Sequence, residues 1–234
     1  VKFEEPPIIC AAASVVGQKE GDGPFGDVFD QIESDPKVGG DTWEDAEGRL
    51  QERAAELAIQ KAGCGKEAIR YIVAGDLLGQ LMASSFGLAG FDKPLFGVYG
   101  ACSTMGESIG IGSMLVEGGF ADYVLAMTSS HFASAEKQFR FPLGYANQRP
   151  KASTWTVTGS GAVVICKGDQ KQGMAKITGI TTGKIVDYGV KDTMNMGACM
   201  APAAASVVAA HFKDFGTDPS EYDQIITGDL GMVG

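Results

Sequence analysis

The sequence predicts an α/β fold built from two related lobes. Short runs of aliphatic and β-branched residues alternate with longer helical segments, which is typical of strands joined by right-handed crossovers in a sheet covered on both faces. One strand-like segment occurs twice, which is the usual sign of an internal duplication. The chain has 234 residues, of which 44% are hydrophobic and 21% charged, enough for one large core or two packed lobes.

Local signals place the individual elements. Asp41 or Thr42 is suited to cap a helix that continues to about Ala62 and ends at Gly63. A second helix is expected to begin at the turn around Cys102 and to continue to about residue 117. Residues 17–40 are acidic and rich in glycine, and are predicted to form a long surface loop. The predicted strands are residues 7–13, 69–74, 95–99, 123–128 and 161–167.

The repeated segment defines the expected lobes. Residues 71–77 read YIVAGDL, and residues 224–230 read QIITGDL. Each copy follows a helix and a polar turn that contains acidic residues, so we expect one lobe over residues 1–168 and the start of a second over residues 169–234. The second copy stops soon after its strand, and we therefore expect the second lobe to be incomplete in this chain.

Charge and cysteine content exclude several classes of function. Nineteen basic and 29 acidic residues give a formal net charge of −10, which argues against nucleic acid or an anionic membrane surface as the main partner. The most apolar stretch, residues 197–210, is shorter than the roughly 20 residues of a membrane span. The five cysteines are scattered and only two histidines are present, so a zinc site or a disulfide framework is not expected.

Cys102 is the strongest candidate for chemistry. It lies between small residues at a strand-to-helix turn, where free backbone N–H groups and the positive end of the helix dipole favour a thiolate. The sequence leaves two interpretations open: a nucleophile or pocket-lining thiol, or a small buried residue at a tight turn.

Two histidines differ in their expected roles. His131 follows residues 123–128 and the pair Ser129-Ser130, and it is expected either to approach Cys102, because neighbouring strand ends share one crevice, or to be a hydrogen-bonded loop residue. His211 lies in an apolar helical stretch near the end of that helix, and it is interpreted as structural.

Asp76 and Asp229 close the two copies of the repeat, each directly after a glycine. They are suited to bind a cation, to accept hydrogen bonds from a ligand, or to cap the next helix, which is the commonest role for such an aspartate.

Two further segments have motif-like composition. Residues 21–26 match G-x-G-x-x-G, but they lie too far from the preceding strand and carry a misplaced Pro24, so we interpret them as a solvated loop. Arg140 lies among aromatic residues close to Tyr145. This combination suits a flat, anionic aromatic ligand and a homodimer contact equally well.

Taken together, the motifs resemble those of the thiolase-like superfamily, and more closely those of the stage V sporulation protein AD family. The resemblance extends over nearly the whole chain. The segments that carry it are AGDLL (74–78), GACST (100–104), MLVEGGFA (114–121), TSSH (128–131), AEKQFR (135–140), TVTGSGAV (156–163), MAPAAA (200–205) and TGDLG (227–231).

This resemblance implies a layered α/β fold of two duplicated thiolase-like lobes, with the reactive cysteine at the head of a central helix. It also implies an inactive enzyme scaffold. The ketoacyl-synthase III branch has an H-x-A-N histidine near the place where this chain reads GDLG (228–231). Cys102 is then a vestigial nucleophile without its acid/base partner, and losing the groups that stabilise developing charge costs orders of magnitude in rate.

The family resemblance implies binding of dipicolinic acid (pyridine-2,6-dicarboxylate) and its uptake, with calcium, into the developing spore. It further implies a cytoplasmic protein held peripherally at the forespore or spore inner membrane by other stage V sporulation membrane proteins, and a homodimer. No cofactor is expected; calcium would enter only within the bound chelate. The expected ligand-binding residues are Asp76, Gln80, Cys102, Ser130, His131, Arg140 and Tyr145.

Charge suggests which form of this ligand binds. Dipicolinate carries two carboxylates and the protein is strongly acidic, so a neutral 1:1 calcium chelate avoids a repulsion that the bare dianion meets. Carboxylates such as Asp76 would then complete the calcium shell. Two alternatives remain: an active acyltransferase or condensing enzyme that uses Cys102 with His131 as base, and a scaffold for spore membrane proteins without a small ligand.

Overall fold

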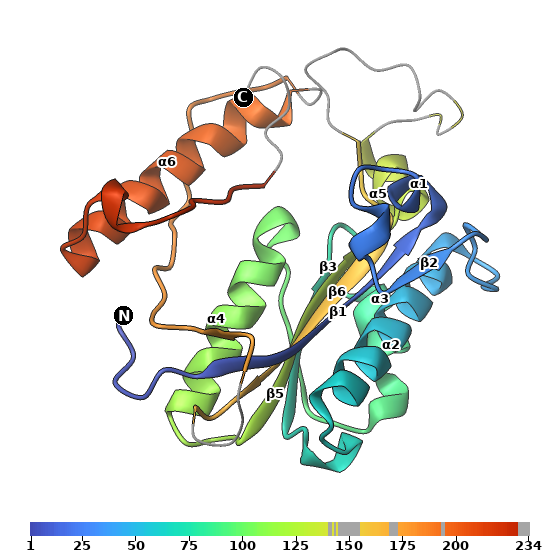
Figure 1. Cartoon of the computed structure of the whole chain (residues 1–234). Coiled ribbons are helices and arrows are strands. Elements are labelled where there is room, and N and C mark those ends of the chain that lie inside the picture. The colour runs from blue at the N-terminus through green and yellow to red at the C-terminus, as the bar shows by residue number, and fades with distance from the viewer. Residues whose placement is uncertain (140–141, 143, 145–154, 169–172, 193–194, 229–234) are drawn as a thin grey trace. The chain divides into compact units, whose positions relative to one another are not determined.

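The structure is a computed structural model, and it describes residues 1–139, 142, 144, 155–168, 173–192 and 195–228 (Figure 1). The chain divides into two compact units. The larger unit comprises Phe3–Gln138 and Thr156–Thr178, and the smaller comprises Val1–Lys2, Phe139–Trp155 and Gly179–Gly234. The division of the two predicted lobes at residue 168 stays a prediction.

The larger unit is a mixed α/β structure built on one sheet. Its strands are β1 (Ile8–Gly17), β2 (Gln31–Glu33), β3 (Tyr71–Asp76), β4 (Leu95–Gly97), β5 (Tyr123–Ser130), β6 (Gly159–Cys166) and β7 (Ala175–Lys176). Its helices are α1 (Gln18–Gly21), α2 (Trp43–Ala62), α3 (Met82–Gly87), α4 (Thr104–Glu117) and α5 (Phe132–Phe139). All five predicted strands and both predicted helices are therefore confirmed, with small shifts at the strand ends.

The strand order is β2-β1-β6-β5-β3-β4, and β7 pairs with β1. β3 is parallel to both β4 and β5, as strands joined by helical crossovers should be. β6 differs, because it runs antiparallel to both β5 and β1. The expectation of crossover connections throughout is thus wrong for β6, and the sheet is mixed.

Helices cover both faces of this sheet, as Figure 1 shows with α2 and α4 on opposite sides. One buried cluster joins the small apolar residues of α2 to Leu125 and Met127 of β5. The other packs residues of α4 against Val124 and Ala126 of the same strand. Successive residues of a strand point to opposite faces, so β5 supplies side chains to both cores.

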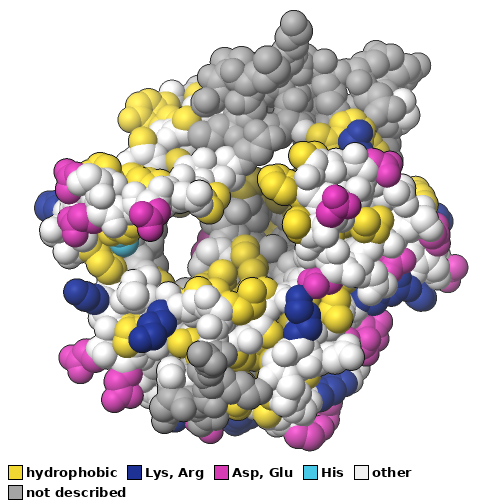
Figure 2. Space-filling model, in the orientation of Figure 1, with side chains coloured by type: hydrophobic (Ala, Val, Ile, Leu, Met, Phe, Trp, Pro, Cys, Tyr) yellow, Lys and Arg dark blue, Asp and Glu magenta, His cyan; other side chains and the backbone are white. Residues whose placement is uncertain are grey.

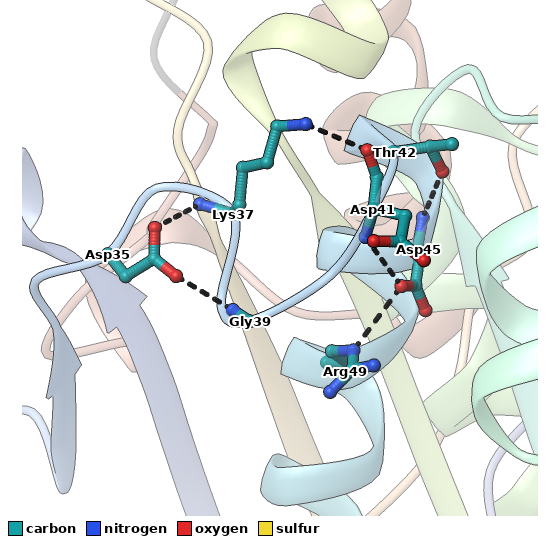
Figure 3. Close-up of polar contacts among 7 residues, drawn as sticks. All are labelled: Asp35, Lys37, Gly39, Asp41, Thr42, Asp45 and Arg49. Atoms are coloured by element: carbon teal, nitrogen blue, oxygen red, sulfur yellow. Dashed lines mark hydrogen bonds and ion pairs between the residues drawn. The ribbon is translucent and has the colours of Figure 1, made fainter.

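The start of α2 is fixed by its preceding loop, drawn in Figure 3. Thr42 is the N-cap, and its hydroxyl accepts a hydrogen bond from the Asp45 backbone N–H at 3.1 Å. The Asp35 carboxylate accepts bonds from the backbone N–H groups of Lys37 and Gly39, at 3.0 and 2.8 Å. The helix ends at Gly63, whose φ of 59° is the left-handed conformation expected of a helix-terminal glycine.

Residues 17–40 are more ordered than the predicted surface loop. They contain α1, a 3₁₀ turn at Gly26–Val28, and β2, which pairs in parallel with the end of β1. The prediction of an unbroken loop was wrong because β2 has only three residues and a weak hydrophobic pattern. The G-x-G-x-x-G segment begins at the last residue of α1 and ends at the first residue of the 3₁₀ turn, so it does not form the link between β1 and α1.

The smaller unit repeats part of the pattern seen around α2. α6 (Met196–Phe215) has the same 20-residue length, is capped by Asn195, and ends at Gly216 with a φ of 64°. A 3₁₀ turn at Pro219–Glu221 follows. Residues 224–228, the second copy of β3, form no strand. Their Ile225 and Ile226 are exposed, and a strand requires a neighbour to share its backbone hydrogen bonds.

Candidate functional site

Polar residues gather where the strands of the larger unit end. Ser129 of β5 is in register with Asp76 of β3 on one side and with Ser160 of β6 on the other. Ser160 is in turn opposite Val15 of β1, next to Ser14. The sheet therefore brings hydroxyl-bearing residues from three strands together at one end of those strands, although Ser14 and Ser160 are more than a hundred residues apart in the sequence.

Cys102 reaches this edge from the turn before α4. A 3₁₀ turn at Ala101–Ser103 leads directly into the helix, and Ala101 has a φ of 50°. That left-handed conformation is uncommon for a residue with a side chain, and such strain is concentrated at functional sites. The Cys102 side chain is exposed at the start of α4, so the predicted turn is confirmed and the alternative of a buried small residue is wrong.

A cavity of about 330 Å³ lies against Cys102 and Ser130, the two predicted site residues that the structure brings together. Its wall contains five hydroxyl-bearing residues: Ser14, Thr128, Ser129, Ser130 and Ser160. The rest of the described wall is apolar or glycine, from residues such as Phe29, Leu77 and Met105. No charged side chain is among the described residues that line it. Four of these hydroxyls already donate to protein acceptors, namely those of Ser14, Ser129, Ser130 and Ser160. The described wall therefore offers a ligand mainly apolar surface and backbone groups.

Asp76 does not line this cavity. It is fully buried, and its carboxylate accepts hydrogen bonds from the Leu81 and Ser84 backbone N–H groups at 3.1 and 3.2 Å, and from the Ser84 hydroxyl at 3.0 Å. These bonds hold the loop that leads into α3, and contact of Asp76 with a ligand or calcium stays a prediction. Of its three proposed roles, the structure assigns the helix-terminal one.

His131 also lies outside the cavity wall. Its Nε2 is 2.7 Å from the Pro36 carbonyl, and its Nδ1 accepts a hydrogen bond from the Ala133 backbone N–H. The ring stacks on Trp43, with centroids 5.5 Å apart. Burial lowers the pKa of His131, so the neutral ring donates through Nε2. Both nitrogens are occupied, and the expected pairing of His131 with Cys102 is wrong.

The remaining predicted residues have different outcomes. Gln80 is exposed in the loop after β3 and is not among the described residues of the cavity wall, so its role in binding stays a prediction. Arg140, Tyr145 and Asp229 lie outside the described residues. His211 is structural, as predicted: its nitrogens lie 2.9 Å from Thr181 Oγ1 and 2.8 Å from the Tyr222 hydroxyl.

Sequence reasoning missed a buried acid behind the cavity. Glu47 of α2 is 1% exposed and accepts hydrogen bonds from the hydroxyls of Ser129 and Ser134 at 2.8 and 2.5 Å. Burial is the main reason that the pKa of Glu47 is raised to about 7. A signal was available in the sequence, because Glu47 and Gln51 lie at helical spacing on the same face as Leu50 and Ala54.

No described group of three or more His, Cys, Asp or Glu side chains is arranged to hold a metal ion. Figure 2 shows Lys and Arg side chains scattered among Asp and Glu on one face of the molecule, with no basic patch among the side chains described there. Across the helices that the structure describes, none has the length and apolar character needed to cross a bilayer.

Comparison with known proteins places these features in a family. The model of the stage V sporulation protein AD family matches residues 1–234. Stage V sporulation protein AD of Bacillus subtilis (strain 168) is 44% identical over 232 residues, which cover 99% of this chain and 68% of that protein.

Solved structures show the fold. Xanthomonas campestris OleA bound with cerulenin superposes with a TM-score of 0.66 at 16% identity, covering 99% of this chain and 77% of OleA. The 3-oxoacyl-(acyl carrier protein) synthase III of Xanthomonas oryzae pv. oryzae gives 0.61 at 17% identity, covering 100% and 80%. The chain therefore has the thiolase-like fold of these enzymes, belongs to the stage V sporulation protein AD family, and has its role in sporulation.

Proposed function

We propose that this chain binds dipicolinic acid and acts in the uptake of dipicolinate and calcium into the developing spore, on a scaffold that has lost catalysis. The observation that carries the proposal is the cavity of about 330 Å³ at Cys102. This volume is within the range of small-molecule sites, and its apolar residues, such as Phe29, Leu77 and Met105, suit the ring of a small aromatic ligand.

No base is among the described residues of the cavity wall, and this supports binding over catalysis. An acyltransferase needs a group that accepts the proton of the attacking thiol. His131 uses both ring nitrogens elsewhere, and no charged or imidazole side chain is among the described residues of the cavity wall. Cys102 then contributes shape and a weakly polar surface to the pocket rather than a nucleophile.

The charge of the cavity favours the neutral calcium chelate of dipicolinate over the bare dianion. The described wall supplies no cation to compensate two carboxylates, and the chain carries a net charge of −10. Within a chelate the ligand's own calcium provides that compensation, so calcium enters as cargo and not as a resident cofactor.

Two partners complete the proposal. The edge strand β4 has all three residues exposed, including Phe96 at 45%, and such an edge can pair with a second copy. We therefore propose a homodimer through β4. Other stage V sporulation membrane proteins would hold the chain peripherally at the forespore or spore inner membrane.

Equilibrium calorimetry with dipicolinate, in the presence and absence of calcium, tests this function. We expect binding that survives Cys102→Ala, and tighter binding with calcium. When the protein is incubated with an acyl thioester, we expect no turnover of the thioester. Acylation of Cys102 followed by turnover would instead establish an acyltransferase, and the absence of binding under both conditions would refute the ligand.

A further inference from the structure

One residue belongs both to the cavity wall and to a buried polar chain behind it. Ser129 lines the cavity at Cys102, and its hydroxyl donates a hydrogen bond to Glu47 Oε1 at 2.8 Å. The same hydroxyl accepts a bond from Gln51 Nε2 at 2.7 Å. The Ser129 side chain points to the α2 face of the sheet, whereas Cys102 precedes α4, which covers the other face. An occupant of the cavity against Ser129 is therefore separated from the Glu47 carboxylate by one layer of sheet.

The chain of hydrogen bonds continues to a second acid. Gln51 Nε2 also lies 3.0 Å from the Ser84 hydroxyl, which donates to the Asp76 carboxylate at 3.0 Å. Glu47 and Asp76 are thus buried at opposite ends of one polar network. In the part of the chain that the structure describes, no lysine or arginine forms an ion pair with either acid.

The surroundings of Glu47 disfavour its negative charge. Burial contributes most to the raised pKa of Glu47, and the carboxylates of Asp76 and Glu44 raise it further, against the two serine hydroxyls that lower it. α3 has no charged side chain and contributes only the Ser84 hydroxyl to this network. The strands β1, β5 and β6 carry no Asp, Glu, Lys or Arg. The other titratable groups on the neighbouring α5 side are the neutral His131, Glu136, and Lys137, which pairs with Glu44.

We propose that Glu47 determines the ligand charge that the Cys102 cavity accepts: an anion binds against Ser129 only together with one proton taken up from solvent by Glu47, whereas a neutral ligand binds without that proton. This inference rests on the proposed function and deepens it. It makes Glu47 a specificity-determining residue that never touches the ligand.

Electrostatics gives the physical reason. Two negative charges on either side of a dry wall repel each other much more strongly than in water, and no charged side chain among the described lining residues compensates them. Protonating Glu47 removes the repulsion. The calcium chelate of dipicolinate is neutral and has no such requirement, so a charged Glu47 selects the chelate over the dianion.

Calorimetry separates these cases. Dipicolinate, either calcium-free or as its 1:1 calcium chelate, is titrated into the full chain at about pH 6 and about pH 8 in two buffers with different ionisation enthalpies. For the wild type we expect the affinity for the dianion to fall about tenfold per pH unit above pH 7, with uptake of close to one proton. The affinity for the chelate should change little.

Two variants on α2 complete the experiment. Glu47→Gln keeps the size and the hydrogen-bonding capacity of the side chain, and it should abolish both the pH dependence and the proton uptake. Glu56→Gln removes the same charge from an exposed position of α2 and should behave as the wild type. Unchanged pH dependence in Glu47→Gln would overturn the inference.

A ligand-free measurement keeps the inference independent of dipicolinate. Iodoacetate and iodoacetamide both alkylate a thiolate, but only iodoacetate is an anion, so the ratio of their rates at Cys102 reports the cavity's preference for charge. Peptide mass spectrometry gives the rates. We expect the iodoacetate-to-iodoacetamide ratio to rise about tenfold in Glu47→Gln at about pH 8. An unchanged ratio refutes the role of Glu47, whereas absence of dipicolinate binding alone refutes only the proposed ligand.

Discussion

Replacing Glu47 with glutamine should remove a specific part of the pH dependence of folding. The pKa of Glu47 is raised from 4.5 to about 7 in the folded chain, so the folded state holds a proton that the unfolded state has released. The stabilisation is therefore complete below about pH 4.5 and is lost as the pH rises through about pH 7. Each pKa unit corresponds to about 1.4 kcal/mol, which gives about 3 kcal/mol in total.

Urea denaturation measures this difference. Trp43 stacks on His131 in the larger unit, and its fluorescence follows the unfolding of the region that contains Glu47. Relative to the wild type, Glu47→Gln should gain about 3 kcal/mol of unfolding free energy between about pH 4.5 and about pH 8. If the hydrogen bonds of the variant are weaker, its unfolding free energy falls by the same amount at every pH. This difference cancels when the values at the two pH limits are compared.

The exposed Glu56→Gln variant provides the control, because its charge is removed from solvent and not from the core. Its unfolding free energy should run parallel to that of the wild type over the same pH range. Parallel curves for Glu47→Gln as well would show that the carboxyl titrates normally, and would refute the reasoning about its burial.

Three further predictions concern other parts of the larger unit. A Cβ at Gly75 would lie 1.9 Å from the backbone carbonyl oxygen of Val98, so Gly75→Ala should lower the unfolding free energy by more than about 3 kcal/mol. Gly106 has open space around it, so Gly106→Ala should leave the unfolding free energy unchanged or raise it by up to about 1 kcal/mol. His131→Ala should cost about 2 kcal/mol in urea denaturation yet leave dipicolinate affinity within twofold; a larger loss of affinity would return His131 to the site. Phe96→Glu should convert the proposed dimer into monomers in sedimentation experiments, and an unchanged dimer would exclude β4 as the interface.

Local signals were sufficient for the main elements. The limits of α2 follow from a capping threonine and a terminal glycine, and the turn at Cys102 follows from its small neighbours. These features depend on residues within one turn of each other, so their physics is contained in a short stretch of sequence. The shared crevice at the strand ends was also predicted, and Cys102 and Ser130 both lie in it.

Side-chain direction at the strand ends could not be predicted in the same way. Asp76 is the last residue of β3 and His131 directly follows β5, but Asp76 turns toward the loop before α3 and His131 toward Pro36. The bond from His131 joins residues that are 95 positions apart, and nothing in the spacing around either residue encodes it. The direction of β6 likewise depends on pairing with β1, far away in the sequence.

Glu47 shows a different limit. Its position on the apolar face of α2 was visible, but the sequence does not say whether such an acid rotates outward or remains inside with partners. Its partners Ser129 and Ser134 are more than 80 residues away. Only the folded arrangement shows that their hydroxyls are placed to satisfy it.

The arrangement around Asp76 bears on how related chains are compared. An aspartate at the end of a strand is easily taken as a reagent or ligand group when related sequences are compared. Here the buried carboxylate fixes the backbone of the loop before α3, so its charge serves the shape of that loop.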